Sequence, residues 1–220
     1  MNGLDALDHR TRPAAGEPDG ALVLMHGRGT GEEDMFPLLD VFDPRRRLIG
    51  LAPGGPVAQP PGGKHWYAVR RVGHPDPTTF ATSFAGLGEW IDSIPEELGV
   101  PPGRTILGGF SQGAVMAYAL GLAAGRPAPA GVLALSGFVP TVQGLELDLE
   151  ARAGLRVAIA HGVNDAVIGV EWGRAARDAL QSAGADVTHL ESPVGHTLDP
   201  RQLPTLAEWV RRTLQPAAAA

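Results

Sequence analysis

Residues 109–113 read Gly-Phe-Ser-Gln-Gly, and they stand between two apolar segments. The segment Arg104–Gly108 reads as a buried strand, and Ala114–Leu120 reads as a buried helix. Such a strand-to-helix turn strains the serine backbone and holds the hydroxyl at the carboxyl edge of a sheet. We therefore take Ser111 as the candidate nucleophile. The alternative is an ordinary serine in a turn, because glycine is about twice as frequent here as in an average protein.

Two later segments contain the partners that a serine nucleophile needs. Asp165 follows the apolar segment Leu155–Ala160, and His196 lies in a loop ahead of the last predicted helix. Both follow predicted strands, where the ligand sites of open α/β sheets lie. In a triad the histidine takes the serine proton and the aspartate fixes the imidazole tautomer. The chain order therefore predicts Ser111, Asp165 and His196 as catalytic residues.

Other histidines and aspartates fit these roles less well. Apart from His26, three histidines precede the nucleophile, which is the wrong order for the base. Of two others, the first immediately follows a predicted strand, where it is expected to hydrogen-bond in the loop that presents Asp165, and the second lies within a strand pattern. One aspartate resembles a helix cap and another a solvated helix residue. In that order, the residues are His9, His65, His74, His161, His189, Asp199 and Asp178.

Length and composition restrict the possible classes of protein. A chain of 220 residues favours one domain with a full core. The net charge of −6 argues against nucleic acid as a partner. The absence of cysteine excludes disulfides and fits a cytoplasmic protein. No signal peptide or membrane-spanning stretch is predicted, the tail 216–220 is expected to fray, and nothing distinguishes a monomer from a homodimer.

Strand and helix signals alternate along the chain. This alternation predicts an α/β fold, with a mostly parallel central sheet and helices on both faces. Residues 1–12 are expected to be weakly ordered or to add a polar antiparallel edge strand over Leu7–Arg12. The predicted strands are Ala21–Met25, Leu48–Ala52, Thr105–Gly108, Gly131–Leu135, Arg156–Ala160 and Asp186–Leu190.

Capping residues indicate where the helices begin and end. Asp76 is expected to cap a helix that Pro77 opens. Thr30 and Glu33 have the spacing of a capping box. A helix over 169–183 is expected to end before Gly184. Asp199 and Pro200 are expected to open the last helix.

Two connections are long for a compact domain, and such connections are often functional. Residues 53–76 and 136–154 each follow a strand, so both are expected to lie over the active edge of the sheet, where they could act as lids. We expect apolar side chains of these and neighbouring loops to line an acyl or alcohol pocket, although core packing is an alternative for Phe138. The candidates are Trp66, Tyr67, Phe138, Val163 and Ile168.

An oxyanion hole needs two backbone N–H groups. One is expected from Gln112, the residue after the nucleophile, and the other from Arg28 in the glycine-rich loop after the first core strand. The Arg28 side chain could hold an acidic substrate group, but a surface pair with an acid at 32–34 is the simpler expectation. His26 in the same loop is expected to be structural.

The glycine-rich loop does not indicate a nucleotide site. It lacks the lysine of a phosphate-binding loop, and Glu32 stands where a third glycine would be needed. No spacing of histidine and carboxylate residues indicates a metal site. We therefore expect neither a metal nor a cofactor.

These motifs together resemble one known family. Leu24–Gly29 (LMHGRG), Gly108–Ala114 (GGFSQGA), Leu135–Gly137 (LSG), His161–Asp165 (HGVND) and Gly195-His196 appear in order over nearly the whole chain. The chain is similar to the phospholipase/carboxylesterase family of α/β-hydrolases. It departs from many members, which have Leu-Gly-Asp after the His-Gly pair where this chain has Arg28-Gly29-Thr30.

The resemblance implies a serine esterase that acts on a small-molecule ester, with small to medium acyl groups. It also implies that Ser111, Asp165 and His196 form the triad and that the Gln112 and Arg28 N–H groups form the oxyanion hole. Two alternatives stay open. One is a thioesterase or lysophospholipase with the same acyl-enzyme, and the other is a non-catalytic ligand-binding protein of this fold.

Overall fold

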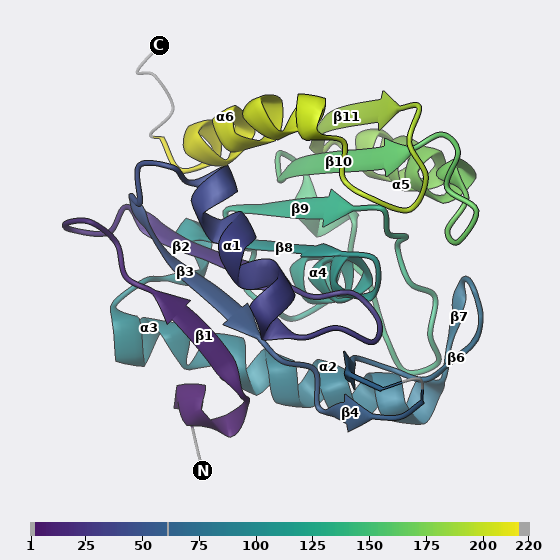
Figure 1. Ribbon diagram of the computed structural model, residues 1–220, viewed down its shortest axis with the longest axis horizontal. Helices are drawn as coiled ribbons and strands as arrows, with labels where there is room; N and C mark the ends of the chain where they lie inside the picture. The colour runs from purple at the N-terminus through teal and green to yellow at the C-terminus, as the bar shows by residue number, and fades with distance from the viewer. Residues whose placement is uncertain (1–2, 61, 216–220) are drawn as a thin grey trace.

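A seven-stranded sheet forms the centre of the protein (Figure 1). The computed structural model describes residues 3–60 and 62–215. Every strand pair of this sheet is parallel except β1 with β3, so the predicted α/β architecture is confirmed. In sheet order the strands are β1 (His9–Arg12), β3 (Leu48–Pro53), β2 (Gly20–Met25), β8 (Thr105–Phe110), β9 (Gly131–Leu135), β10 (Arg156–Gly162) and β11 (Asp186–Ser192).

Helices cover both faces of the sheet. The helices α1 (Glu32–Phe42) and α6 (Leu203–Thr213) lie together on one face. The other face carries α2 (Pro77–Asp92), α4 (Gln112–Leu122) and α5 (Val170–Ser182), with the short α3 (Ile94–Leu98) after α2. Short 3-10 turns are η1 (Gly3–Ala6), η2 (Pro102–Arg104), η3 (Glu150–Arg152) and η4 (Pro200–Gln202).

The sequence of β2 shows how one strand supports both layers. All of its residues are buried. Successive side chains of a strand point to opposite faces. Accordingly Ala21, Val23 and Met25 pack with α2, α4 and α5, whereas Leu22 and Leu24 pack with α1 and α6. A continuous apolar run is therefore what a central parallel strand requires.

The helix ends agree only in part with the predicted capping residues. Asp76 Oδ1 accepts a hydrogen bond from the Thr79 N–H at 3.0 Å, and α2 starts at Pro77 as expected. Asp199 caps η4, so α6 begins three residues later than predicted.

The capping box predicted at Thr30 and Glu33 is wrong. The Thr30 hydroxyl donates to the Gly27 carbonyl, because the Thr30 backbone pairs with Lys64 ahead of the helix. Instead Gly31 occupies the cap of α1, and its N–H donates to Asp34 Oδ2 at 3.2 Å.

The segment 53–76 is more regular than a loop. It holds two small hairpins, one of β4 (Val57–Ala58) with β5 (Lys64–His65) and one of β6 (Val69–Arg71) with β7 (His74–Pro75). Short strands of two or three residues leave little sequence periodicity to detect. Residues 136–154 are mostly irregular and include η3.

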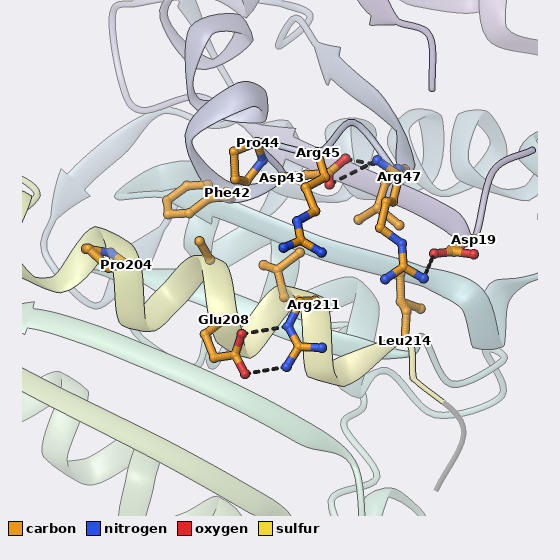
Figure 2. Close-up of a pocket in the computed structure, with 13 residues that line it drawn as sticks. Asp19, Phe42, Asp43, Pro44, Arg45, Arg47, Pro204, Glu208, Arg211 and Leu214 are labelled. Atoms are coloured by element: carbon orange, nitrogen blue, oxygen red, sulfur yellow. Dashed lines mark hydrogen bonds and ion pairs between the residues drawn. The ribbon is translucent and has the colours of Figure 1, made fainter. Parts of the chain in front are cut away.

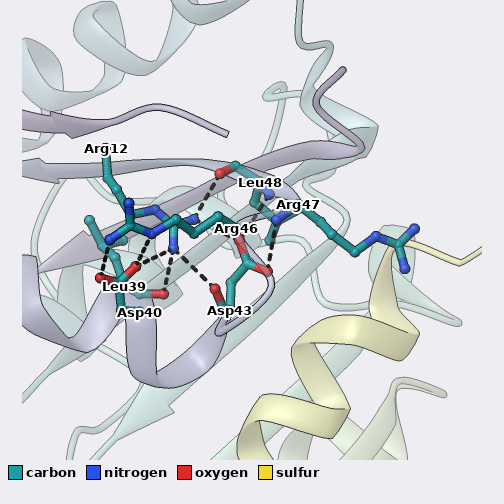
Figure 3. Close-up of polar contacts among 7 residues, drawn as sticks. All are labelled: Arg12, Leu39, Asp40, Asp43, Arg46, Arg47 and Leu48. Carbon is teal, nitrogen blue, oxygen red and sulfur yellow. Dashed lines mark hydrogen bonds and ion pairs between the residues drawn. The ribbon is translucent and has the colours of Figure 1, made fainter. Parts of the chain in front are cut away.

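Arg12 ties the edge strand β1 to the first helix (Figure 3). Its buried guanidinium donates to the carbonyls of Leu39, Asp43 and Leu48, and it forms a 2.6 Å ion pair with Asp43. Asp40 adds a second ion pair at 3.0 Å. The network satisfies carbonyls at the carboxyl end of α1, where a positive charge is favourable.

The predicted frayed tail, residues 216–220, and the first two residues lie outside the described part of the chain. Within residues 3–60 and 62–215, no helix has both the length and the apolar content to cross a membrane.

Candidate active site

Ser111 lies between β8 and α4, at the carboxyl edge of the sheet. Its φ of 55° and ψ of −116° are strained for a residue with a side chain. The turn is also crowded. A Cβ atom at Gly109 would lie 2.4 Å from the Gly113 carbonyl carbon, and one at Gly113 would lie 2.0 Å from the Met25 oxygen. Glycine is therefore required on both sides of the serine.

The structure brings Ser111, His196 and Asp165 into one hydrogen-bonded chain. His196 Nε2 lies 2.9 Å from Ser111 Oγ, and His196 Nδ1 lies 2.7 Å from Asp165 Oδ2. Because His196 Nδ1–H donates to the carboxylate, Nε2 is left as the acceptor for the serine hydroxyl. Phe110 packs against the imidazole with a centroid distance of 4.9 Å, which fixes the ring from one side. This arrangement can remove a proton from Ser111.

Backbone N–H groups hold the Asp165 carboxylate in place. Its Oδ1 accepts from the Val167 N–H at 2.9 Å and from the Ile168 N–H at 2.8 Å. Burial alone would raise the pKa of Asp165, but the hydrogen bonds from His196, Ile168 and Val167 keep that pKa below its ordinary value. The aspartate therefore stays ionised opposite the imidazole.

His161 supports the same turn rather than serving as a base. Its buried Nε2 lies 2.8 Å from the Ile168 carbonyl oxygen and 3.6 Å from Asp165 Oδ2. His161 thus lies within β10 rather than after it, but it makes the predicted contact with the loop that carries Asp165.

Two backbone N–H groups belong to residues that line the pocket with Ser111. Gln112 is the first residue of α4, where the N–H has no acceptor within the helix. Arg28 lies in the loop after β2, and both residues line the same pocket as Ser111. Within the described chain, neither N–H donates a hydrogen bond. Both are thus free to bind an oxyanion.

Side chains around these donors hold the loops rigidly. The Gln112 side chain accepts from the Trp66 N–H at 3.0 Å and donates to the Tyr67 carbonyl at 2.8 Å. His26 Nδ1 lies 2.7 Å from the Gly27 oxygen, and its Nε2 accepts from the Gly55 N–H at 2.8 Å. Burial lowers the pKa of His26, so the ring is a neutral structural group.

A pocket of about 560 Å³ opens over Ser111 and His196. Of the side chains predicted to line it, Tyr67, Phe138 and Ile168 do so. The predictions for Trp66 and Val163 are wrong. Trp66 is 0% exposed, because its indole N–H donates to the His26 carbonyl and anchors it in the core. Val163 is 39% exposed and lies outside the pocket lining.

Several lining residues were not predicted. Most come from α1, from the β6–β7 hairpin and from the Asp165 turn, where Val167 is 55% exposed, while Phe110 ends β8 and Leu198 follows His196 in the chain. The sequence signal that could have indicated these residues was the proline, the glycine and the valines of the hairpin segment. The unpredicted apolar lining residues are Met35, Leu38, Val69, Val72, Pro75, Phe110, Val167 and Leu198.

A second hollow of about 520 Å³ lies between the end of α1, the start of β3 and α6 (Figure 2). Its described lining contains Arg45, Arg47 and Arg211 but no serine, threonine or histidine. Glu208 pairs with Arg211, and Asp19 pairs with Arg47. This hollow therefore offers no nucleophile.

In the described residues, no cluster of three or more histidines or acids could hold a metal ion.

Comparison with known proteins gives a consistent picture. The family model described as Phospholipase/Carboxylesterase matches residues 8–214. Esterase YpfH of Escherichia coli is 28% identical, and the match covers 88% of this chain and 82% of that protein. Acyl-protein thioesterase 1 of Gibberella zeae is 24% identical, and the match covers 93% of this chain and 94% of that protein. The Bacillus cereus carboxylesterase structure has a TM-score of 0.81 and 26% identity, covering 94% of both chains.

Proposed function

Because the chain belongs to the phospholipase/carboxylesterase family, whose relatives are esterases and thioesterases, we propose that it is a serine carboxylesterase. In this proposal it hydrolyses small to medium acyl esters through an acyl-enzyme. The observation that carries the proposal is the hydrogen-bonded chain from Ser111 Oγ through His196 to Asp165 Oδ2, at 2.9 and 2.7 Å.

The first half-reaction begins at Ser111. Its oxygen attacks the ester carbonyl carbon while His196 Nε2 takes the hydroxyl proton, and Asp165 stabilises the resulting imidazolium. The carbonyl oxygen becomes an oxyanion, which the Arg28 and Gln112 N–H groups bind. His196 then gives its proton to the leaving alcohol, and the acyl group remains on Ser111.

The second half-reaction repeats these steps with water. His196 takes a proton from a water molecule, which attacks the acyl-enzyme carbonyl. The same two N–H groups bind the second oxyanion. His196 returns the proton to Ser111 Oγ, and the carboxylic acid leaves.

The pocket supports small to medium acyl groups as substrates. Its volume of about 560 Å³ is within the usual range for small-molecule sites, and apolar side chains dominate its walls. We also propose a cytoplasmic location, which the cysteine-free sequence supports.

Ester hydrolysis is tested with p-nitrophenyl esters from acetate to palmitate. We expect turnover that falls at long chain lengths and that drops by at least about 10³-fold in Ser111→Ala, because only the acyl-enzyme route is removed. Ser83→Ala is the matched control, since Ser83 is also buried but lies in α2. Equal turnover by Ser111→Ala and wild type would contradict the mechanism.

Thioester substrates separate the main alternative. An acyl-protein thioesterase has the same acyl-enzyme chemistry, so sequence and geometry favour neither leaving group. Comparing oxygen and sulfur esters of one acyl chain measures the preference. A kcat/KM much higher for the thioester would replace the carboxylesterase proposal with a thioesterase.

A further inference from the structure

Most arginines of this acidic chain are engaged by an acid or a carbonyl group. Within residues 3–60 and 62–215, only four arginines have neither an ion pair nor a hydrogen-bond acceptor for the side chain. They are Arg28, Arg45, Arg71 and Arg104. Two of them, Arg28 and Arg71, line the pocket over Ser111. Arg45 points into the second hollow (Figure 2).

The acids nearest to Arg28 in sequence are engaged elsewhere. Glu32 forms an ion pair with Lys64 at 2.8 Å, and Glu33 forms one with Arg10 at 2.9 Å. Asp34 lines the pocket and accepts from the Gly31 N–H. The surface pair expected for Arg28 is therefore absent from the described structure, which leaves the exposed guanidinium available to a ligand.

Arg71 reaches the pocket from a different wall. In β6, Val69 and Arg71 both line the pocket, whereas Arg70 between them pairs with Asp76 at 3.3 Å. Both flanking residues line the pocket although the pairing of β6 with β7 is irregular between Val69 and Arg71. The pocket thus has two cationic side chains on separate walls against one carboxylate, Asp34, in a chain of net charge −6.

We propose that the substrates of this esterase carry an anionic group at the far end of the acyl chain, and that Arg28 and Arg71 bind it. A guanidinium fits the oxygens of carboxylate or phosphate groups through paired N–H donors. The anion belongs to the acyl part, because His196 protonates the leaving alcohol, which therefore lies toward the wall of residues 196–198. The arginines come from the other walls. This inference rests on the proposed esterase function.

The test compares two p-nitrophenyl esters of matched chain length, the neutral hexanoate and the anionic adipate monoester. The readout is the ratio of kcat/KM for the anionic ester to that for the neutral ester. We expect this ratio to fall about threefold in Arg28→Gln and in Arg71→Gln, and about tenfold in the double variant, as for exposed charges. High salt should reduce the wild-type ratio and leave the double variant nearly unchanged.

Two controls isolate the pocket charges. Arg104→Gln removes an unpaired, exposed arginine in η2, and Arg45→Gln removes one from the second hollow, so neither should change the ratio. The Arg28→Gln and double variants both keep the backbone N–H of residue 28, which is proposed to bind the oxyanion. The 6-phosphonohexanoate p-nitrophenyl ester then shows whether carboxylate or phosphonate is preferred, and dependence on the arginines for either one supports the proposal.

The possible failures are distinguishable. If neutral esters are hydrolysed through Ser111 but neither arginine variant changes the ratio for either anionic ester, the substrate inference is overturned and the esterase stands. If no ester is hydrolysed by the folded protein, both proposals are overturned.

Discussion

At the scale of single residues, the site depends on side chains whose position is fixed by backbone hydrogen bonds. Gln112 shows this most clearly. Its N–H is free beside Ser111, while its buried side chain is bonded to residues 66 and 67. Between these two bonds the Trp66 side chain is buried in the core, where its indole N–H donates to the His26 carbonyl, and Tyr67 lines the pocket. Neighbouring aromatic residues therefore serve different purposes, and sequence alone does not indicate which one faces the pocket.

His26 should make stability depend on pH. Burial lowers the pKa of the folded ring below 6.5, so the unfolded chain binds more protons than the folded chain in weak acid. The stabilisation is complete above the unfolded pKa and is lost as the pH falls through the folded value. We expect the free energy of unfolding in urea to fall from pH 8 to pH 5, and to fall less in His26→Gln.

The control for this measurement is His74→Gln, because His74 is exposed. It should retain the wild-type dependence on pH. A His26→Gln variant with a dependence as steep as that of wild type would show that another group is responsible.

At the scale of elements, Arg12 joins three segments that are distant in sequence. Its guanidinium contacts the end of α1 and the start of β3 from within β1, as Figure 3 shows. Replacing Arg12 by Met leaves Asp43 buried without its ion-pair partner and several carbonyls without a donor. We expect a loss of about 3–5 kcal/mol in the free energy of unfolding, measured by chemical denaturation.

Arg10→Met is the matched change on the same strand. Arg10 pairs with Glu33, but both side chains are more than half exposed, so the loss should stay below about 1 kcal/mol. Equal losses for the two variants would mean that the Arg12 network has little net effect on stability.

The elements also show how far the sequence could predict the protein. Long apolar runs such as those of β2 and β10 identify central strands, because only apolar side chains suit a strand covered on both faces. The turn around Ser111 could be predicted because glycine is required on both sides of it. The hairpins at 57–75 could not, since their strands are short and their position depends on distant contacts. The catalytic roles themselves stay predictions.

At the scale of the whole molecule, Ser111 and one of the pocket walls belong to regions that differ in burial. All residues of α4 are buried, whereas the β6–β7 hairpin has exposed residues from Arg70 to Val72. We expect amide hydrogens of α4, β2 and β8 to exchange slowest, and those of the hairpin to exchange much faster. Hydrogen exchange followed by mass spectrometry measures this order, and fast exchange in α4 would contradict it.

The strand order of the sheet has a consequence for synthesis on the ribosome. β2 pairs with β3 soon after both emerge, but its other edge needs β8, with Met25 opposite Gly109. More than 80 residues must therefore be added after Met25 before β2 can pair with β8. During that interval an apolar strand edge stays open, and open edges invite wrong pairing. The nascent chain is thus most vulnerable to aggregation before the segment that carries Ser111 is made.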